Sequence, residues 1–252
     1  MKPSPENCSR FLALSLTLAV ASAGAQAFTA TYDFLQVSTT SGTTDPTPPP
    51  TAPGVTFGSF TSAGASSNPN AGGRFSFTAQ PLGGVNASDD FTQFTGSLNL
   101  TVYFELSLTP LNLVALQLDS LAFTVQRSGT GIRSYAVRSS LDGYATNLAA
   151  SISPANANLT VGPGDEFRWV SDAVTTAQNG STVTLGAPFV NLTSGITFRI
   201  YGWNAEAGTG TFSLDNVTLR GRTDSVPEPS LTTLWLGWLA VVGIRRRLAG
   251  PV

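Results

Sequence analysis

"SLNLTVYFELSL", residues 97–108, alternates apolar and polar side chains along its whole length. Leucine, valine and phenylalanine occupy every second position from Leu98 to Leu108, and mostly polar residues stand between them. Strand side chains point alternately to the two faces of a sheet, so this pattern predicts a strand with one buried face. We therefore expect a β-sheet protein with a long, half-buried strand over 97–108.

Several further stretches show the same character. They cover residues 121–127, 134–140, 181–187, 195–203 and 210–221, and they are rich in Val, Ile, Thr, Phe and Tyr, the residues enriched in strands. Short strands without helical crossovers are typical of an antiparallel β-sandwich or jelly roll. Asp142-Gly143, between two such runs, predicts a tight hairpin turn. The predicted fold class is all-β, an antiparallel β-sandwich or jelly roll.

Composition excludes several kinds of chemistry. The chain has 252 residues, of which 11% are charged, with a net charge of −2 and no histidine. That length allows one substantial domain with appendages. A chain with so few basic residues has no surface that could neutralise a nucleic-acid backbone, so we expect no nucleic-acid partner.

The N-terminus has the parts of a secretory signal peptide. Lys2 and Arg10 precede an apolar run over 11–23, which is too short to cross ~30 Å of hydrocarbon. Ala25 and Ala27 fit the small-x-small cleavage rule, so residues 1–27 are predicted to be removed after Ala27. The alternative is an uncleaved anchor or a buried helix.

Cleavage there would also remove Cys8, the one cysteine of the chain. The exported protein would then have neither cysteine nor histidine. This excludes a disulfide, a thiolate nucleophile, a Ser-His-Asp triad and a zinc site built from His or Cys.

Residues 28–225 are predicted to form the ectodomain. Within it, residues 39–73 contain segments rich in Pro, Gly, Ser and Thr, at 39–54 and 61–73. Adjacent prolines favour an extended path that cannot enter the interior of a sheet. We expect both segments to be exposed loops with the role of a flexible spacer.

The C-terminus, "VPEPSLTTLWLGWLAVVGIRRR" over 226–247, is unlike the rest. Residues 230–244 carry no charge and would rise ~22 Å as a helix, short of the ~30 Å hydrocarbon core. Trp235 and Trp238 suit a membrane interface, and the arginines that follow suit the cytoplasmic side. We expect a short transmembrane helix over 230–244. The alternative is an ordinary helix packed on the sandwich.

These features resemble the PEP-CTERM sorting signal of bacterial exosortase substrates. The resemblance rests on a motif, an apolar segment and a basic cluster in that order at the chain end, over residues 226–252. It implies export, transient residence in the inner membrane, and processing by an exosortase-type enzyme before release to the cell surface or the extracellular space. The sorting motif would be Val226, Pro227, Glu228 and Pro229, and the retention signal Arg245, Arg246 and Arg247. Residues 127–149 and 197–221 also resemble β-sandwich domains found ahead of this signal.

Two functions remain open for the ectodomain. One is a binding module for extracellular polysaccharide, in which aromatic rings stack on sugars and polar side chains bind hydroxyl groups. The candidate residues are Tyr144, Trp169, Tyr201, Trp203, Arg133, Arg138 and Asn204. The other is a purely structural matrix protein.

A third hypothesis, a glycoside hydrolase with two carboxylates, has weaker support. Its candidates Asp89, Asp90, Asp165 and Glu166 lie in loop-like sequence, where solvated charges are expected. We expect no enzymatic activity and no cofactor. A structural Ca²⁺ clasp between Asp33 and Asp215, from the first and last strands, is an alternative to two simple turn residues.

Overall fold

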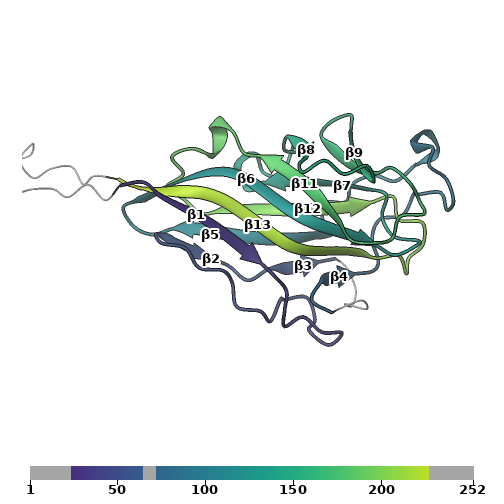
Figure 1. Ribbon diagram of the computed structural model, residues 1–252, viewed down its shortest axis with the longest axis horizontal. Helices are drawn as coiled ribbons and strands as arrows, with labels where there is room; N and C mark the ends of the chain where they lie inside the picture. The colour runs from purple at the N-terminus through teal and green to yellow at the C-terminus, as the bar shows by residue number, and fades with distance from the viewer. Residues whose placement is uncertain (1–23, 65–71, 227–252) are drawn as a thin grey trace, which may run out of the picture.

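The protein is a sandwich of two antiparallel sheets, described by a computed structural model over residues 24–64 and 72–226 (Figure 1). Every pairing between its named strands is antiparallel. The prediction of an all-β protein with two packed antiparallel sheets is confirmed.

The first sheet has the strand order β1-β13-β6-β11-β8, and β4 also pairs with β13. Its strands are β1 (Gln26–Tyr32), β4 (Phe75–Phe77), β6 (Val114–Arg127), β8 (Ala150–Ile152), β11 (Gln178–Thr184) and β13 (Phe212–Ser225). The two long strands β6 and β13 form its centre.

The second sheet has the order β2-β5-β12-β7-β10-β9, and β3 also pairs with β5. Its strands are β2 (Val55–Phe57), β3 (Thr61–Ala63), β5 (Tyr103–Pro110), β7 (Ser134–Ser139), β9 (Leu159–Gly162), β10 (Glu166–Trp169) and β12 (Ile196–Trp203).

Helical structure is limited to three 3₁₀ turns within the described ranges: η1 (Phe91–Gln93), η2 (Ser140–Asp142) and η3 (Ala187–Phe189). None of the helices in this part of the chain is long and apolar enough to cross a membrane. The apolar run 11–23 and the segment 230–244 lie outside the described residues.

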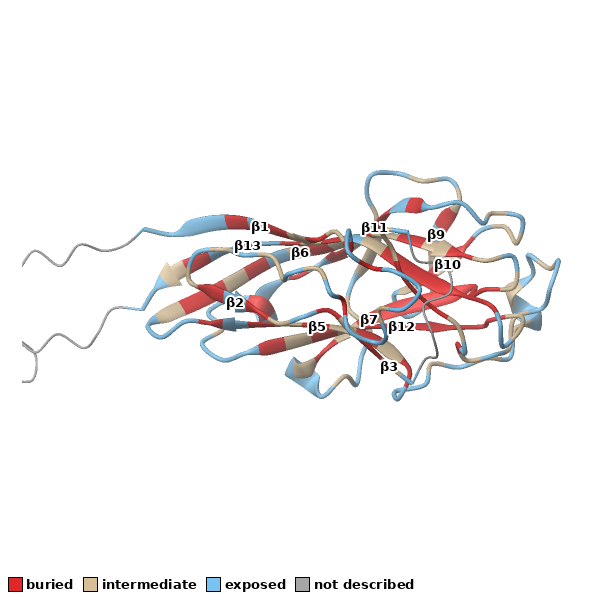
Figure 2. Ribbon diagram, turned by 90° about the horizontal axis from the view of Figure 1, so that it is seen from below, coloured by how far each residue is buried: buried red, intermediate tan, exposed pale blue. Residues whose placement is uncertain are grey.

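The core lies between the sheets, where alternate side chains of each strand are buried (Figure 2). In β5 these are Phe104, Leu106 and Leu108. The ring of Phe104, from the second sheet, contacts a group of phenylalanines from the first sheet and from the β2–β3 connection: Phe60, Phe75, Phe77 and Phe212. Such ring pairs add to the stabilisation that burial of apolar area provides.

The strand predicted over 97–108 begins only at Tyr103. The side chain of Asn99 accepts hydrogen bonds from the backbone N–H and the hydroxyl of Thr101, and its carbonyl accepts one from Val102. Asn side chains stabilise turns in this way, and here the turn interrupts the strand despite the continuing alternation. Residues 97–102 therefore belong to a loop.

The turn at Asp142-Gly143 is not a hairpin. Gly143 and Tyr144 have left-handed backbone, but Asp142 belongs to the 3₁₀ turn η2, and the strands on either side do not pair. The chain leaves β7 in the second sheet and enters β8 in the first. The segment 61–73 also departs from the prediction, because its first residues form β3.

The two ends of the described chain lie together. In the β1–β13 ladder Gln26 is opposite Thr223, and in Figure 1 β1 begins where β13 ends. The predicted cleavage point falls at the start of β1, where Ala25 and Ala27 are exposed and Phe28 is the first buried side chain. At the other end, the N–H of Val226 donates to Leu113 at 2.8 Å. The last described strand therefore ends two residues before Pro227.

Deletion of residues 227–252 is therefore expected to leave a soluble sandwich with an unchanged Tm, because no described strand extends beyond Ser225. A packed C-terminal helix predicts the opposite. Removing it would expose core surface at ~25 cal/mol per Å² and lower the free energy of unfolding by several kcal/mol. Thermal melts of the full chain and of the deletion variant, together with gel filtration, separate the two outcomes.

Candidate functional site

The seven predicted ligand-binding residues do not form one site. Trp169, Tyr201 and Trp203 are almost fully buried, at 0%, 0% and 6% exposure. Their rings present no accessible face on which a sugar could stack, which corrects the prediction for these three. Arg133 is fully buried, and Asn204 is buried under a loop. Only Arg138 and Tyr144 are partly exposed.

Arg138 and Tyr144 lie on the outer face of the second sheet, where a row of charged residues crosses three strands. Arg199 on β12 is opposite Glu105 on β5 and Arg138 on β7. The Arg199 Nε donates to Glu105 at 2.7 Å. Although partial burial disfavours the cation, this hydrogen bond raises the pKa of Arg199. Opposed like charges destabilise a sheet, so the Glu105 partner offsets the Arg199–Arg138 repulsion.

Two tyrosines stack on Arg199. The centre of its guanidinium lies 3.9 Å from the ring centroid of Tyr103 and 4.0 Å from that of Tyr144. Two rings at van der Waals distance cannot share one face of a guanidinium, so the cation lies between them. Cation–π contacts of this kind are worth ~0.5–1 kcal/mol at exposed sites and more when desolvated. We call Tyr103, Glu105, Arg138, Tyr144 and Arg199 the tyrosine face.

The backbone around Tyr144 is held by several hydrogen bonds. Tyr144 has a φ of 63°, which is rare for a bulky side chain and costs on the order of 1–3 kcal/mol. Its carbonyl accepts from Arg138 Nη1 at 2.9 Å, and its N–H donates to Ser139. Asp142 accepts from the backbone N–H groups of Ala145 and Thr146. The loop is thus preorganised with Tyr144 against Arg199.

A second, small apolar cluster lies on the same outer face. Tyr201 and Trp203 alternate with the inward side chains of β12, so they project away from the main core. With Ala136 they form a buried cluster covered by Leu98 and Tyr103. The loop 78–102 thus turns part of an outer face into an interior. This explains why these two aromatic residues are buried.

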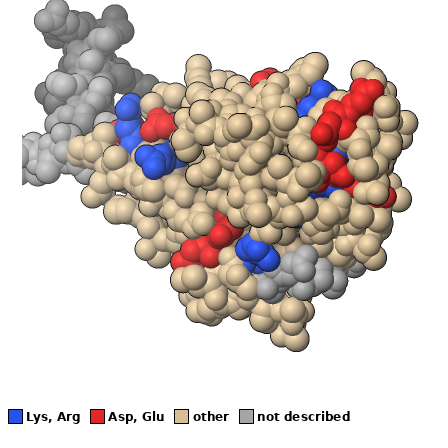
Figure 3. Space-filling view, turned by 45° about the vertical axis from the view of Figure 1, so that its right-hand side comes forward, with Lys and Arg blue, Asp and Glu red and all other residues tan. Residues whose placement is uncertain are grey.

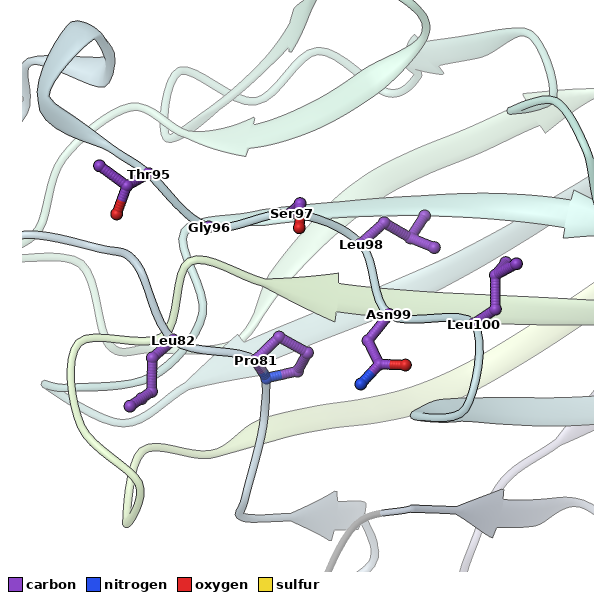
Figure 4. Close-up of a pocket in the computed structure, with 8 residues that line it drawn as sticks. All are labelled: Pro81, Leu82, Thr95, Gly96, Ser97, Leu98, Asn99 and Leu100. Atoms are coloured by element: carbon purple, nitrogen blue, oxygen red, sulfur yellow. The ribbon is translucent and has the colours of Figure 1, made fainter.

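The same loop forms an open cleft of about 570 Å³ beside this cluster (Figure 4). Its lining mixes apolar and polar residues: Pro81, Leu82, Thr95, Gly96, Ser97, Leu98, Asn99 and Leu100. Leu82 and Leu100 are 57% and 51% exposed, which is high for leucine. The sequence predicted none of these residues as a site, because it placed 97–102 in a strand. We call this pocket the leucine cleft.

Asn204 and Ala205 bind the two segments of the chain that form the leucine cleft. We call these segments its limbs: one contains Gly83 and Gly84, and the other contains Gly96. The side chain of Asn204 accepts from the N–H of Gly96 at 2.9 Å, and the carbonyl of Ala205 accepts from Gly83 and Gly84. The limbs approach so closely that a Cβ on Gly96 would lie 2.4 Å from Asn204 Oδ1. Asn204, predicted to bind a ligand directly, instead positions the cleft.

A group of ionic side chains, all buried or mostly buried except Asp89, lies behind this loop, at the end of the sandwich away from the chain ends. We call them the distal charge cluster: Asp89, Arg127, Arg133, Asp172 and Glu206. Arg127 donates to Asp172 at 2.7 Å and to Glu206 at 2.8 Å, and Arg133 to Asp89 at 3.0 Å. Both arginine side chains and Glu206 have 0% exposure. Breaking such a buried pair is expected to be strongly destabilising.

The carboxyl group of Glu206 has an unusual proton affinity. Burial, a side-chain hydrogen bond with Asp172 and the negative charge of Asp172 raise its pKa to about 7, against the opposing effect of Arg127. For Asp172, burial acts to raise the pKa, but hydrogen bonds from Glu206 and Arg127 hold it below its usual value. A carboxyl group with a raised pKa beside one with a lowered pKa is the arrangement of a catalytic acid–base pair. However, two carboxyl groups that share a hydrogen bond are closer together than the ~5–9.5 Å that separates the carboxyl groups of glycosidases.

The carboxylates predicted for a hydrolase are engaged elsewhere. Asp89 bonds Arg133, and Asp90 caps η1 through the N–H of Thr92. Asp165 accepts from the N–H of Ala150, and Glu166 pairs with Arg168. Hydrogen bonds from Asp172 and Thr92 lower the pKa values of Asp89 and Asp90 respectively, which disfavours a general acid at either position.

Asp33 and Asp215, the predicted Ca²⁺ clasp, lie near enough to interact. Burial raises the pKa of Asp215, and the negative charge of Asp33 adds to this. Each carboxylate accepts a local backbone N–H, from Leu35 and Asn216 respectively. Among residues 24–64 and 72–226, no group of three or more acidic, His or Cys side chains could hold a metal ion. The Ca²⁺ site stays a prediction.

The surface view in Figure 3 shows charged side chains only in a few small groups between wide areas of other residues. This agrees with the low charged content of the chain. Of the residues predicted for sorting, Val226 is described and exposed, whereas Pro227, Glu228, Pro229 and the arginines 245–247 lie outside the described residues. No family model, no curated protein and no solved structure matches the chain.

Gly96→Ala is expected to displace the limbs of the leucine cleft, because the new Cβ would meet Asn204 Oδ1 and the carbonyl of Leu82, both at 2.4 Å. We expect a loss of about 1–3 kcal/mol in the free energy of unfolding, measured by urea denaturation. Gly129→Ala is the matched control, since no atom lies within 4 Å of the position that its new Cβ would occupy. Equal stability of the two variants would contradict the close approach of the limbs.

Proposed function

We propose that the protein is an exported β-sandwich module that associates with extracellular polysaccharide after its C-terminal sorting tail has been processed. The observation that carries the proposal is the separation of the two ends of the sandwich. The chain enters at β1 and leaves at β13 at one end, and the leucine cleft lies at the other. β13 has 14 residues, which at ~3.3 Å each span ~46 Å.

This arrangement suits a domain that is tethered during processing. The sorting motif would begin at Val226, directly after the last described strand, so an enzyme acting at Pro227–Pro229 would leave every described strand intact. The leucine cleft and the loops around it would meanwhile face away from the membrane.

The tyrosine face and the leucine cleft support polysaccharide as the ligand class. Polysaccharide sites combine ring faces or apolar side chains with hydrogen-bonding groups. Tyr103 and Tyr144 are half-buried rings beside Arg138, Glu105 and Asn147. The leucine cleft is linked to this surface through Leu98, which packs against the same Tyr201–Trp203 cluster as Tyr103. The surface is open, as an extended chain requires.

A purely structural matrix protein is the second candidate. The observation that favours it is that the guanidinium of Arg199 occupies one face of each tyrosine ring. In that case the stack stabilises the sheet and binds nothing. A carboxylate-based glycoside hydrolase is disfavoured by the engaged carboxylates described above.

The binding part of the proposal is tested by affinity electrophoresis of the exported protein in gels containing dextran, a neutral polysaccharide, or alginate, an acidic one. We expect retardation in at least one gel. Replacing both Tyr103 and Tyr144 by alanine should weaken it about tenfold, since each ring contact contributes ~0.5–1.5 kcal/mol. Leu35→Ala, at a residue 74% exposed in the loop after β1, is the control and should bind normally. A wild-type protein that migrates normally in both gels supports the structural role instead.

The sorting part is tested in cells that contain the processing enzyme. Replacing Pro227, Glu228 and Pro229 by alanines should leave export intact, because the signal peptide and the sandwich are unchanged. The unprocessed protein should then accumulate in the inner membrane, held by residues 230–244 and by arginines that cost ~2.5–3.5 kcal/mol each to insert. Cell fractionation and intact mass measure this. Normal release of the triple variant would reject the sorting motif.

A further inference from the structure

Glu206 and Asp172 cannot both be ionised in the arrangement that the structure describes. Their side chains share a hydrogen bond, and two carboxylates have no donor between them. One of the two therefore carries a proton. The burial and partners of each residue show which one.

Glu206 is the protonated partner. Its side chain has 0% exposure, and its Oε2 accepts no hydrogen bond from any donor of the described residues. Asp172 is better placed to remain charged. It is 16% exposed, Oδ1 accepts from Arg127 at 2.7 Å, and Oδ2 accepts from the N–H of Ala87 at 2.8 Å. Burial without compensation favours the neutral form, so the proton stays on Glu206.

The charges of the cluster balance only while that proton is present. The groups that face Glu206 come from the end of β6 (Arg127), the β6–β7 turn (Arg133) and the β10–β11 loop (Asp172). Asp89, from the loop 78–102, faces Arg133. With Glu206 neutral, two cations meet two anions. With Glu206 ionised, three anions face two cations, and although Glu206 Oε1 still accepts from Arg127, the buried Oε2 would bear charge with no donor to bind it, which is costly.

This cluster is attached to the middle of the loop that forms the leucine cleft. Asp172 binds the N–H of Ala87, and its own N–H donates to Asp89 at 2.6 Å. Arg133 donates to the carbonyl of Ser88 at 2.6 Å. Glu206 itself directly follows Ala205, whose carbonyl holds Gly83 and Gly84. The loop that forms the leucine cleft is therefore held in place by the residues of the distal charge cluster.

We propose that the proton shared by Glu206 and Asp172 is a switch that keeps the loop 78–102 closed, and that its loss near neutral pH loosens the leucine cleft. The direction follows from linkage. The pKa of Glu206 is about 7 in the folded protein and 4.5 for the free side chain. The closed state is therefore favoured in full below about pH 4.5, and this contribution is lost as the pH rises through about 7.

The switch is tested by amide hydrogen exchange of the exported protein at pH 5 and pH 8, corrected for the intrinsic rates. The reporters are the N–H groups of Gly83, Gly84 and Thr95, which hold the limbs of the cleft. If opening returns Glu206 to water, these pKa values predict an opening equilibrium on the order of 50-fold higher at pH 8. Amides of the β7–β12 ladder serve as an internal reference and should not change.

Two variants isolate the proton. Glu206→Gln keeps a neutral donor toward Asp172 at all pH values, so its protection should be the same at pH 5 and pH 8. Asp172→Asn removes the opposing charge and should also abolish the pH dependence, which covers the case that the first variant folds poorly. Glu166→Gln, in the separate ion pair with Arg168, is the matched control and should retain the wild-type dependence.

Equal protection of the wild-type reporters at both pH values would overturn the switch. So would an unchanged pH dependence in Glu206→Gln. The effect of the switch on ligand rests on the proposed function, whereas its effect on exchange does not. Failure to bind dextran or alginate therefore leaves the switch standing, and a pH-independent loop leaves the binding proposal standing.

Discussion

The structure depends on the pairing of β13 along both of its edges. One edge follows β6 from Phe212 to Ser225, and the other is covered by β4 and then by β1. Two irregularities in the ladder accommodate the twist, and at the second a side chain is impossible. A Cβ on Gly221 would lie 2.4 Å from the carbonyl of Gln117. Because β13 is the last strand and β1 the first, the first sheet closes only when the whole ectodomain is present, and such long-range pairing is intrinsically slow.

The same pairing separates the molecule into two functional ends. Its C-terminal half brings residues 26 and 223 together, so whatever tethers the chain tethers it there. Its N-terminal end follows the loop that carries Glu206, and there β6 ends at Arg127. The loops at this far end are joined to one another by charged groups as well as by an isolated backbone bridge between Leu82 and Ala205. The strands of the sandwich are thus held by pairing along their length. The loops at the far end depend, in contrast, on the protonation of Glu206.

The strands were predictable where both the periodicity and its cause are local. β7 and β12 begin and end within a residue of the stretches 134–140 and 195–203, because β-branched and aromatic residues alternate without a turn signal between them. The same alternation is misleading at 97–102, where Asn99 forms a turn. Leu98 then covers Tyr201 and Trp203 on the outer face. Periodicity shows which side chains share a face of the strand, but it does not show whether a loop covers that face. This is why Tyr201 and Trp203 were predicted as ligand contacts although they are buried.

The candidate site was predictable only in part, for the same reason. Arg138 and Tyr144 are close in sequence and lie together, whereas Arg199 and Tyr103 join them through strand pairing that no local pattern reveals. The distal charge cluster is the extreme case, since its members are contributed by separate segments of the chain. Buried ion pairs of this kind are weak sources of stability, because desolvation offsets their attraction. Hydrophobic side chains would close the end of the sandwich at lower cost, yet they could not respond to pH. The chain has no histidine, so a buried carboxyl pair is the group available to it for titration near neutrality.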